Sequence, residues 1–240
     1  MLDSFTLILQ KYGTLYLTGL SMTVQLTVLS LLIGFFIAWP LALMLMARQR
    51  PHIYWPARSF VYYMTGTPML TQLFLVYFGL GQFEMVRESV LWPVLREPYW
   101  CALIAFSLNT AAYSAEIFRG AMANTATGEI DAARAFGMDG LRLWWRILAP
   151  SAFRRALPAY GNELIFLMHS TSLASIITLL DLTGAARESA RGTFAFSESY
   201  FIAIALYMML TGSIVLAVRF AEQRLLAHLG DSKKYKTATR

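Results

Sequence analysis

The chain is built from long apolar blocks separated by short charged segments. A membrane-spanning helix needs about 20 predominantly apolar residues, and the first block is longer than one span requires, so it is expected to tilt or to continue beyond the bilayer. The pattern predicts an all-α, polytopic membrane protein with five transmembrane helices in a single domain, residues 1–240. The expected spans are roughly Leu17–Ala47, Phe60–Leu80, Cys101–Phe118, Tyr160–Leu180 and Tyr200–Arg219.

Composition supports the membrane class. Charged residues make up 14% of the chain, against about 25% in soluble domains, and the net charge of +6 does not by itself indicate a nucleic-acid partner. The single cysteine, Cys101, excludes an intrachain disulfide, and the three histidines lie too far apart in the sequence to form a zinc-ligand spacing. The first apolar block is too long for a cleavable signal peptide and is expected to be an uncleaved span.

The segments between the blocks alternate in charge. The first carries three arginines and no acid, the third has a net charge of +3, and the tail from Arg219 has a net charge of +4. The second and fourth segments each have a net charge of −1. Because positive residues collect on the cytoplasmic side, we expect a periplasmic N-terminus, a cytoplasmic C-terminus, and a cytoplasmic loop at residues 128–150.

This loop interrupts the apolar pattern with helix-forming sequence. Residues Glu129–Ala135 predict a short helix that Gly137 stops, and Leu141–Leu148 predicts a second helix with Pro150 beyond it. Composition alone also allows an amphipathic helix that lies on anionic lipid headgroups.

The spacing of residues in the loop resembles the coupling loop of ATP-binding-cassette (ABC) importer permeases, which reads E-A-A-x-x-x-G, nine residues, and then I-x-L-P. Asp131 stands in the place of the glutamate and Ala149 in the place of the leucine. In that family the loop forms a coupling helix that docks in a groove of a cytoplasmic ATPase. The resemblance implies ATPase-coupling roles for Glu129, Asp131, Ala132, Ala133, Arg134, Gly137, Ile147 and Pro150. The small alanines would let the helix seat closely in that groove.

Three further stretches resemble permeases for polar amino acids. They are "TGTPMLTQLFLVYFG" at 65–79, "SLNTAAYSAEIFRGA" at 107–121 and "YGNELIFLMHSTSLAS" at 160–175. The chain is identified as a member of the histidine/arginine/ornithine type of this family, similar to the M subunit of those systems. The resemblance implies the type I importer fold in the bacterial inner membrane. It also implies partners: a second homologous permease, with a heterodimer favoured by the "HSTSL" segment, two ATPase subunits and a periplasmic amino-acid-binding protein.

No phosphate-binding G-x-x-x-x-G-K-[ST] sequence occurs. We therefore expect a transport subunit that is not an enzyme and binds no cofactor, with ATP and Mg²⁺ bound by the partner ATPase. The resemblance implies alternating access, driven by ATP, of a substrate delivered by the binding protein. Cationic amino acids (arginine, ornithine, lysine, histidine) are the expected substrates, and opines or neutral and acidic amino acids stay open.

Polar side chains inside the apolar blocks indicate a candidate substrate path. Asn109 and Glu116 are seven residues apart and share one helix face, and an intramembrane carboxylate such as Glu163 would suit a cationic substrate. The structural alternative for Glu116 is an ion pair with Arg119 or with the coupling loop. The full candidate set is Glu163, Asn162, Ser170, Thr171, Asn109, Glu116, Thr65, Thr67 and Gln72.

Two candidates depart from the family pattern, because Ser170 replaces an aspartate that some relatives carry and Thr65 replaces an arginine. The first departure leaves open whether this subunit holds a complete substrate site. Thr65–Pro68 is expected to break the second span, either exposing backbone groups to substrate or forming a kink in which threonine hydroxyls bond the freed carbonyls. Pro40 and Pro158 predict similar kinks, with Pro158 at the start of the fourth span. His169 is interpreted as a packing residue rather than a proton relay.

Two other functions compete with an ABC permease. A proton-coupled secondary transporter would use Glu163 or Glu116 as a titrating carboxylate, but it leaves the spacing of the cytoplasmic loop unexplained. A membrane-anchored assembly or signalling subunit would tolerate removal of the charges on the polar faces.

Overall fold

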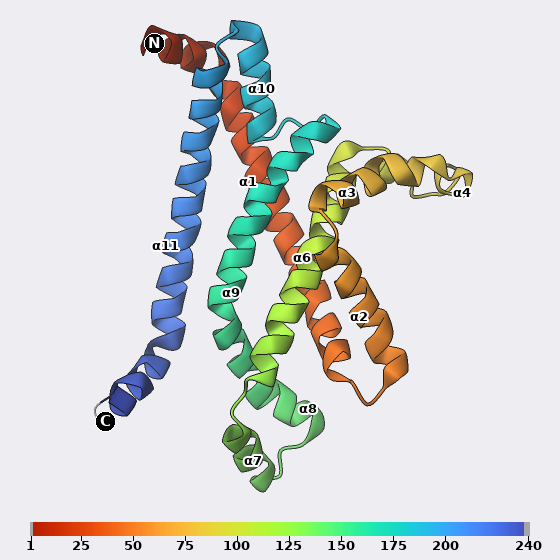
Figure 1. Cartoon of the computed structure of the whole chain (residues 1–240), viewed down its shortest axis with the longest axis vertical. Coiled ribbons are helices and arrows are strands. Elements are labelled where there is room, and N and C mark those ends of the chain that lie inside the picture. The colour runs from red at the N-terminus through yellow and green to blue at the C-terminus, as the bar shows by residue number, and fades with distance from the viewer. Residues whose placement is uncertain (1, 238–240) are drawn as a thin grey trace.

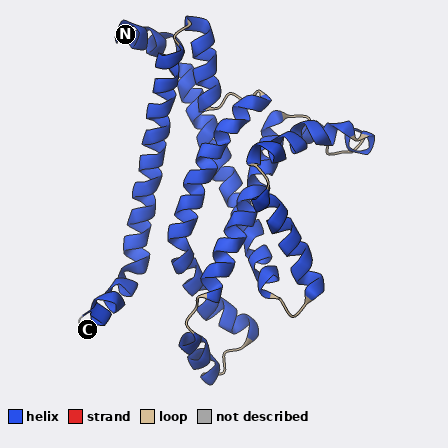
Figure 2. Ribbon diagram, viewed as in Figure 1, coloured by secondary structure: helices blue, strands red, loops and turns tan. Residues whose placement is uncertain are grey.

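The computed structural model describes the backbone of residues 2–237 and the side chains of residues 5–225. Helices joined by short connections make up this described part, in which no strand occurs (Figures 1 and 2). The elements are α1 (Leu2–Met46), α2 (Pro51–Gly66), α3 (Met69–Phe74), a π-helical turn (Leu75–Gly79), a 3₁₀ turn (Leu80–Gln82), α4 (Glu84–Arg87), α5 (Trp92–Leu95), α6 (Pro98–Ala123), α7 (Thr127–Ala135), α8 (Gly140–Leu143), a π-helical turn (Trp144–Leu148), α9 (Ala149–Ser170), a 3₁₀ helix (Thr171–Ile177), α10 (Leu182–Thr193) and α11 (Phe196–Thr237).

Within the described residues, three helices are long and apolar enough to cross a membrane. These are α1 from Phe5, α6, and α11 as far as Leu225. A fourth crossing results if Gly140–Ile177 and α10, which meet at an angle of 47°, count as one broken span. The described helices therefore do not reach the five spans that the sequence predicts.

The second apolar block accounts for the difference. Its helix begins at Pro51, nine residues before the expected start, and stops at Gly66, where Thr67 is extended with φ −117° and ψ 147°. Pro68 is extended as well, with φ −62° and ψ 136°. Proline lacks the backbone N–H and disfavours helix in the residue before it. The block is consequently divided between α2 and the shorter apolar segment Met69–Gln82.

The fourth apolar block begins earlier than the sequence predicts. Helical backbone runs without a break from α8 through the π-helical turn into α9. Pro150 therefore lies inside this continuous helical run and ends no helix, although proline lacks the N–H that an interior position would donate. Pro158 lies inside α9 rather than at its start. The segment expected to be a loop after this block contains α10, which Asp181 caps by accepting hydrogen bonds from the N–H groups of Gly184 and Thr183.

One hydrophobic core cluster lies where α1, α2, α6 and α9 meet, and two others lie further along α1, one toward α3 and α6 and one toward α10 and α11. Phe118 of α6 stacks on Trp39 of α1, with ring centroids 4.6 Å apart, and buried alanines bring the helix backbones close together. Gly34 is one site of close approach, because a Cβ atom there would lie 2.4 Å from Cγ2 of Thr110 on α6. The long α11 runs along one edge of the molecule (Figure 1), with only 6% of its most apolar stretch buried.

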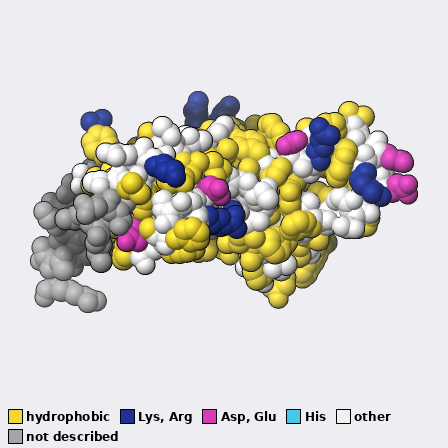
Figure 3. Space-filling view, turned by 90° about the horizontal axis from the view of Figure 1, so that it is seen from above, with side chains coloured by type: hydrophobic (Ala, Val, Ile, Leu, Met, Phe, Trp, Pro, Cys, Tyr) yellow, Lys and Arg dark blue, Asp and Glu magenta, His cyan; other side chains and the backbone are white. Residues whose placement is uncertain are grey.

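The two ends of the molecule differ in which segments they carry. The turn between α1 and α2, the segment α7–α8 and the end of α11 lie at the lower end of Figure 1, and the N-terminus and α10 lie at the upper end. The segments with an excess of arginine thus share one end. Viewed from the upper end, the surface is largely hydrophobic, with acidic side chains at the tip of the arm that α4 forms (Figure 3). The lysines of the basic tail lie outside the described side chains.

The contact at Gly34 predicts opposite outcomes for two glycines of the same helix. Alanine is favoured over glycine inside a helix by about 0.5–1 kcal/mol. Gly13→Ala should therefore be neutral or stabilising, since nothing lies within 4 Å of a Cβ there. Gly34→Ala should lower the thermal unfolding midpoint of the purified permease, because α1 must move away from α6. Equal midpoints for the two variants would show that the close approach is not essential.

Candidate coupling loop and substrate path

The short helix α7 ends where the sequence predicts and begins earlier, at Thr127 instead of Glu129. It ends at Ala135, and Gly137 follows with φ +74°, a backbone conformation that favours glycine. The N–H of Gly137 donates to the carbonyl of Arg134 at 2.8 Å, and the N–H of Met138 donates to that of Ala133 at 3.0 Å. These bonds satisfy carbonyls at the helix end, as in a glycine C-cap. The predicted helix over Glu129–Ala135 with a stop at Gly137 is confirmed.

Glu129 anchors α7 to α9. Its carboxylate accepts hydrogen bonds from Nη2 of Arg155 at 3.2 Å and from Oγ of Ser151 at 3.3 Å. Arg155 also donates to Ser151 and, at 2.5 Å, to the carbonyl of Asn124. Glu129 is therefore held by its own chain. The sequence did not predict this anchor, because its donors lie more than 20 residues further along.

Other loop residues divide between the surface and the interior. Asp131 and Arg134 face outward, with side chains 72% and 60% exposed and a separation of 4.0 Å. Ala132 is exposed, whereas Ala133 is 4% exposed and packs against its own chain. The two alanines, expected to seat together in a partner's groove, therefore point in different directions. The second part of the loop pattern, Ile147 and Pro150, lies on the π-helical turn and on α9.

Two amide side chains close the break between α2 and α3. Nε2 of Gln72 donates to the carbonyls of Met64 at 2.8 Å and Thr67 at 3.1 Å. Nδ2 of Asn109 donates to Oε1 of Gln72 at 2.9 Å and to the carbonyl of Met64 at 3.2 Å. Both side chains are buried, at 4% and 7% exposure. Gln72 and Asn109 therefore point inward and bond backbone groups, and a place for them along the substrate path stays a prediction.

The hydroxyls of the threonines at the break bond backbone carbonyls of the preceding turn, as predicted for a kinked helix. The hydroxyl of Thr65 donates to the carbonyl of Val61 and that of Thr67 to the carbonyl of Tyr63, each at 2.8 Å. The carbonyl of Thr65 accepts from the hydroxyl of Tyr113 at 3.3 Å. The break is thus bonded by its own threonines as well as by α6.

Glu116 is paired with two arginines. One carboxylate oxygen lies 2.5 Å from Nη1 of Arg58 on α2, and the other lies 2.7 Å from Nε of Arg119 on α6. The ion pair between Glu116 and Arg119, the structural alternative for this residue, is confirmed, and a role in the substrate path stays a prediction. Arg58 was missed as a partner because the sequence places it in a loop, whereas it lies within α2.

The polar residues of α9 do not share one face. Glu163 is 7% exposed and accepts a hydrogen bond from the hydroxyl of Thr110 on α6 at 2.8 Å. Its neighbour Asn162 is exposed. The hydroxyls of Ser170 and Thr171 donate to carbonyls of their own helix, at 2.8 and 2.7 Å.

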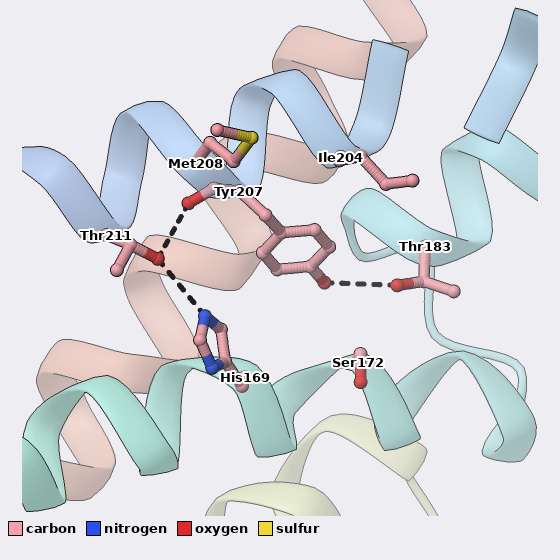
Figure 4. A pocket seen from close by; sticks show the side chains of 7 residues that line it. All are labelled: His169, Ser172, Thr183, Ile204, Tyr207, Met208 and Thr211. Atoms are coloured by element: carbon pink, nitrogen blue, oxygen red, sulfur yellow. Dashed lines mark hydrogen bonds between the residues drawn. The ribbon is translucent and has the colours of Figure 1, made fainter. Parts of the chain in front are cut away.

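His169 lines a groove of about 600 Å³ between α9, α10 and α11 (Figure 4). Its Nε2 lies 3.1 Å from the hydroxyl of Thr211, and its ring packs edge-on against Tyr207. The hydroxyl of Tyr207 lies 3.1 Å from that of Thr183 and donates to Asp181 at 3.3 Å. No acid lines the groove itself, so the interpretation of His169 as a packing residue agrees with these contacts.

Long apolar helices with a charged helical excursion at one end are the features of a polytopic membrane protein. The part of the chain that the structure describes contains no group of three metal-ligating side chains. Residues 30–226 match the model of the family described as "binding-protein-dependent transport system inner membrane component". The chain belongs to this family.

Individual relatives agree with the family. The chain is 45% identical to the octopine transport system permease protein OccM of Rhizobium meliloti, over 88% of this chain and 82% of that protein. It is 37% identical to the histidine/lysine/arginine/ornithine transport system permease protein HisM of Escherichia coli strain K12, over 91% and 92% of the two chains. A solved chain from the "crystal structure of an amino acid ABC transporter with histidines" superposes with a TM-score of 0.80 at 33% identity, covering 91% of this chain and 97% of the solved one.

Family membership confirms the resemblance read from the sequence. The protein is an inner-membrane permease subunit of an ABC importer, it is not an enzyme, and it binds no cofactor of its own, since the nucleotide is held by a partner ATPase. A secondary transporter and a subunit without a transport role are thereby set aside.

Removing the buried amide of Gln72 should lower the stability of the permease, whereas removing the exposed amide of Gln82 should not. Gln72→Ala removes three donor contacts and leaves Asn109 with the carbonyl of Met64 as its remaining acceptor, which should cost about 1–3 kcal/mol for the buried groups left unpaired. Gln82→Ala is the control, because its amide donates only to the carbonyl of Phe78 at an exposed position. Thermal unfolding of the two purified variants makes the comparison. Loss of transport by Gln72→Ala with an unchanged unfolding midpoint would assign Gln72 to the substrate path instead.

Proposed function

We propose that this permease imports substrates that carry a cationic side chain beside a carboxylate: arginine, ornithine, lysine or histidine, or an opine formed from one of them. The octopine and histidine/lysine/arginine/ornithine permeases among its relatives support this class, because octopine retains the guanidinium group of arginine. Within the chain, the observation that carries the proposal is the buried carboxylate of Glu163 directly beside the exposed Asn162 on α9.

The proposed path follows the exposed side of α9 and the helix break that faces it. Asn162 lies at one end of this side and the half-buried Ser170 at the other. Tyr113 joins the two elements, since its ring packs at 6.4 Å from that of Phe166 and its hydroxyl bonds the carbonyl of Thr65. Glu163 lies beneath this surface, and its negative charge would attract a guanidinium or ammonium group, because charges interact strongly in a medium of low dielectric constant.

The proposed coupling route runs from α7 to the path. Asp131, Ala132 and Arg134 form the outward surface for the ATPase. The bond between Glu129 and Arg155 fixes α7 to the start of α9, and α9 carries Asn162 and Glu163. A displacement of α7 when ATP closes the ATPase would therefore move the wall of the path, and ATP would bias a two-state pore through differential contacts.

The remaining parts of the importer follow from the same proposal. A second homologous permease completes the path in a heterodimer, two ATPase subunits bind the α7 end, and a periplasmic binding protein delivers the substrate. The arginine-rich end is cytoplasmic together with the C-terminus, and the N-terminus is periplasmic, as the charge distribution favours.

The glycine that ends α7 provides a test of coupling. Gly137→Val places a β-branched residue at φ +74°, which is strongly disfavoured, and should reorient the end of α7. We expect fewer ATPase subunits to co-purify and substrate-driven ATP hydrolysis to fall, with the amount of permease in the membrane unchanged. Gly128→Val, inside α7 at a position with open space, is the control. Normal ATPase recruitment and transport by Gly137→Val would show that α7 does not couple.

The substrate class is tested by ATP hydrolysis of the reconstituted complex with its binding protein, across arginine, ornithine, lysine, histidine, octopine and neutral amino acids. Stimulation should be strongest with the cationic set or with octopine. Glu163→Gln should reduce stimulation by these compounds severalfold and leave a transported neutral amino acid unaffected.

Glu116→Gln is the matched control. Glu116 lies on α6, where its carboxylate is already paired with Arg58 and Arg119. Its effect should be the same for every substrate. Equal losses for cationic and neutral substrates in Glu163→Gln would assign Glu163 a structural role, and stimulation by neutral amino acids alone would contradict the proposed class.

A further inference from the structure

Two cavities of different chemistry adjoin at the arginine-rich end of the molecule. One is a pocket of about 310 Å³ to which three arginines contribute, Arg146, Arg154 and Arg155, together with Glu129. The other is a groove of about 890 Å³ with an almost wholly apolar lining. Pro150 lines both cavities, so a polar compartment and an apolar one lie next to each other at this residue.

The polar compartment carries uncompensated positive charge. Glu129 is paired with Arg155 at 3.2 Å, so its negative charge is balanced by that arginine and does not offset Arg146 or Arg154. Arg146 and Arg154 form no ion pair among the residues whose side chains the structure describes. Both are exposed, and the pocket therefore suits an anionic group.

The apolar compartment has the form of a site for hydrocarbon chains. Phe35 and Trp39 line it from α1, and Trp144, Trp145 and Phe153 line it from the opposite side. On α1 the lining extends from Phe35 to Leu43, about 12 Å along the helix at 1.5 Å per residue, and this stretch belongs to the membrane-spanning part of α1. Trp145 is 62% exposed and Leu141 72% exposed. Tryptophan at the end of an apolar span is typical of the membrane–water interface.

We propose that the two cavities together bind one anionic phospholipid of the cytoplasmic leaflet. Its phosphate headgroup lies at Arg146 and Arg154, and an acyl chain lies in the groove between α1 and the segment α8–α9. Basic pockets beside membrane helices on this side bind anionic headgroups. The groove favours a lipid over a free anion, because a free anion would leave it uncovered. Continuity of the groove with the spanning part of α1 favours a lipid over the ATPase, which does not enter the bilayer.

The site has a structural consequence for the coupling loop. The headgroup would contact the first turns of α9, directly beside the Glu129–Arg155 anchor. The bound lipid would hold α1 against the π-helical turn Trp144–Leu148. The charge of the lipid headgroup would thereby act on the first turns of α9, to which α7 is bound through Glu129 and Arg155.

Quenching of tryptophan fluorescence by brominated acyl chains tests the site. The whole importer is reconstituted in phosphatidylcholine vesicles with a series of mole fractions of phosphatidylglycerol, and bromine is placed on either lipid. We expect brominated phosphatidylglycerol to quench at about thirtyfold lower mole fraction than brominated phosphatidylcholine, the ratio expected for two arginines at an anionic lipid. Arg146→Gln combined with Arg154→Gln should abolish this difference.

Arg48→Gln combined with Arg50→Gln is the control. These arginines are exposed in the turn between α1 and α2 at the same end of the molecule, and their loss removes the same charge. The control should keep the preference for phosphatidylglycerol. Equal loss in both double variants would show only a general surface attraction and overturn the site. Unchanged quenching with loss of the ATPase subunits in the Arg146/Arg154 variant would place these arginines at the ATPase and also overturn it.

Discussion

Every backbone polar group that enters a bilayer needs a partner within the protein, and the architecture of this permease depends on that constraint. Where Pro68 interrupts the second apolar block, the freed carbonyls do not face lipid. Gln72 and Asn109 bond Met64 and Thr67, and the hydroxyls of Thr65 and Thr67 bond the preceding turn. The broken helix is possible because α6 supplies an amide at the same depth.

Paired charges at the arginine-rich end connect helices that are separate in the sequence. Glu116 joins α2 to α6 through Arg58 and Arg119, and Glu129 joins α7 to α9 through Arg155. Each carboxylate is held by more than one donor, which fixes orientation as well as adding energy. A helix on the surface of this end is therefore connected to the helix that carries the proposed substrate path.

The sequence by itself determined the class of the protein and the location of the short helix α7, the proposed coupling segment. Apolar length and the scarcity of charge require membrane helices. The alternation of loop charge agrees with the ends at which the structure places those loops. Spacing within 128–150 located α7 and its terminating Gly137, because helix caps are local in sequence. The sequence also indicated that Thr65–Pro68 would break a helix, since the effect of proline acts on its immediate neighbours.

Only the tertiary structure decided which polar residues face inward. Gln72 and Asn109 bond each other across 37 positions, and Glu163 bonds Thr110 across 53, distances over which sequence periodicity carries no information. Helical periodicity groups residues by face but does not say which face meets another helix. Asn162 and Glu163, adjacent in sequence, thus lie on the exposed and buried sides of α9. For the same reason, the sequence did not predict Arg58 as a partner of Glu116. It also did not predict that the basic pocket lies next to the aromatic groove, because helix packing brings these residues together.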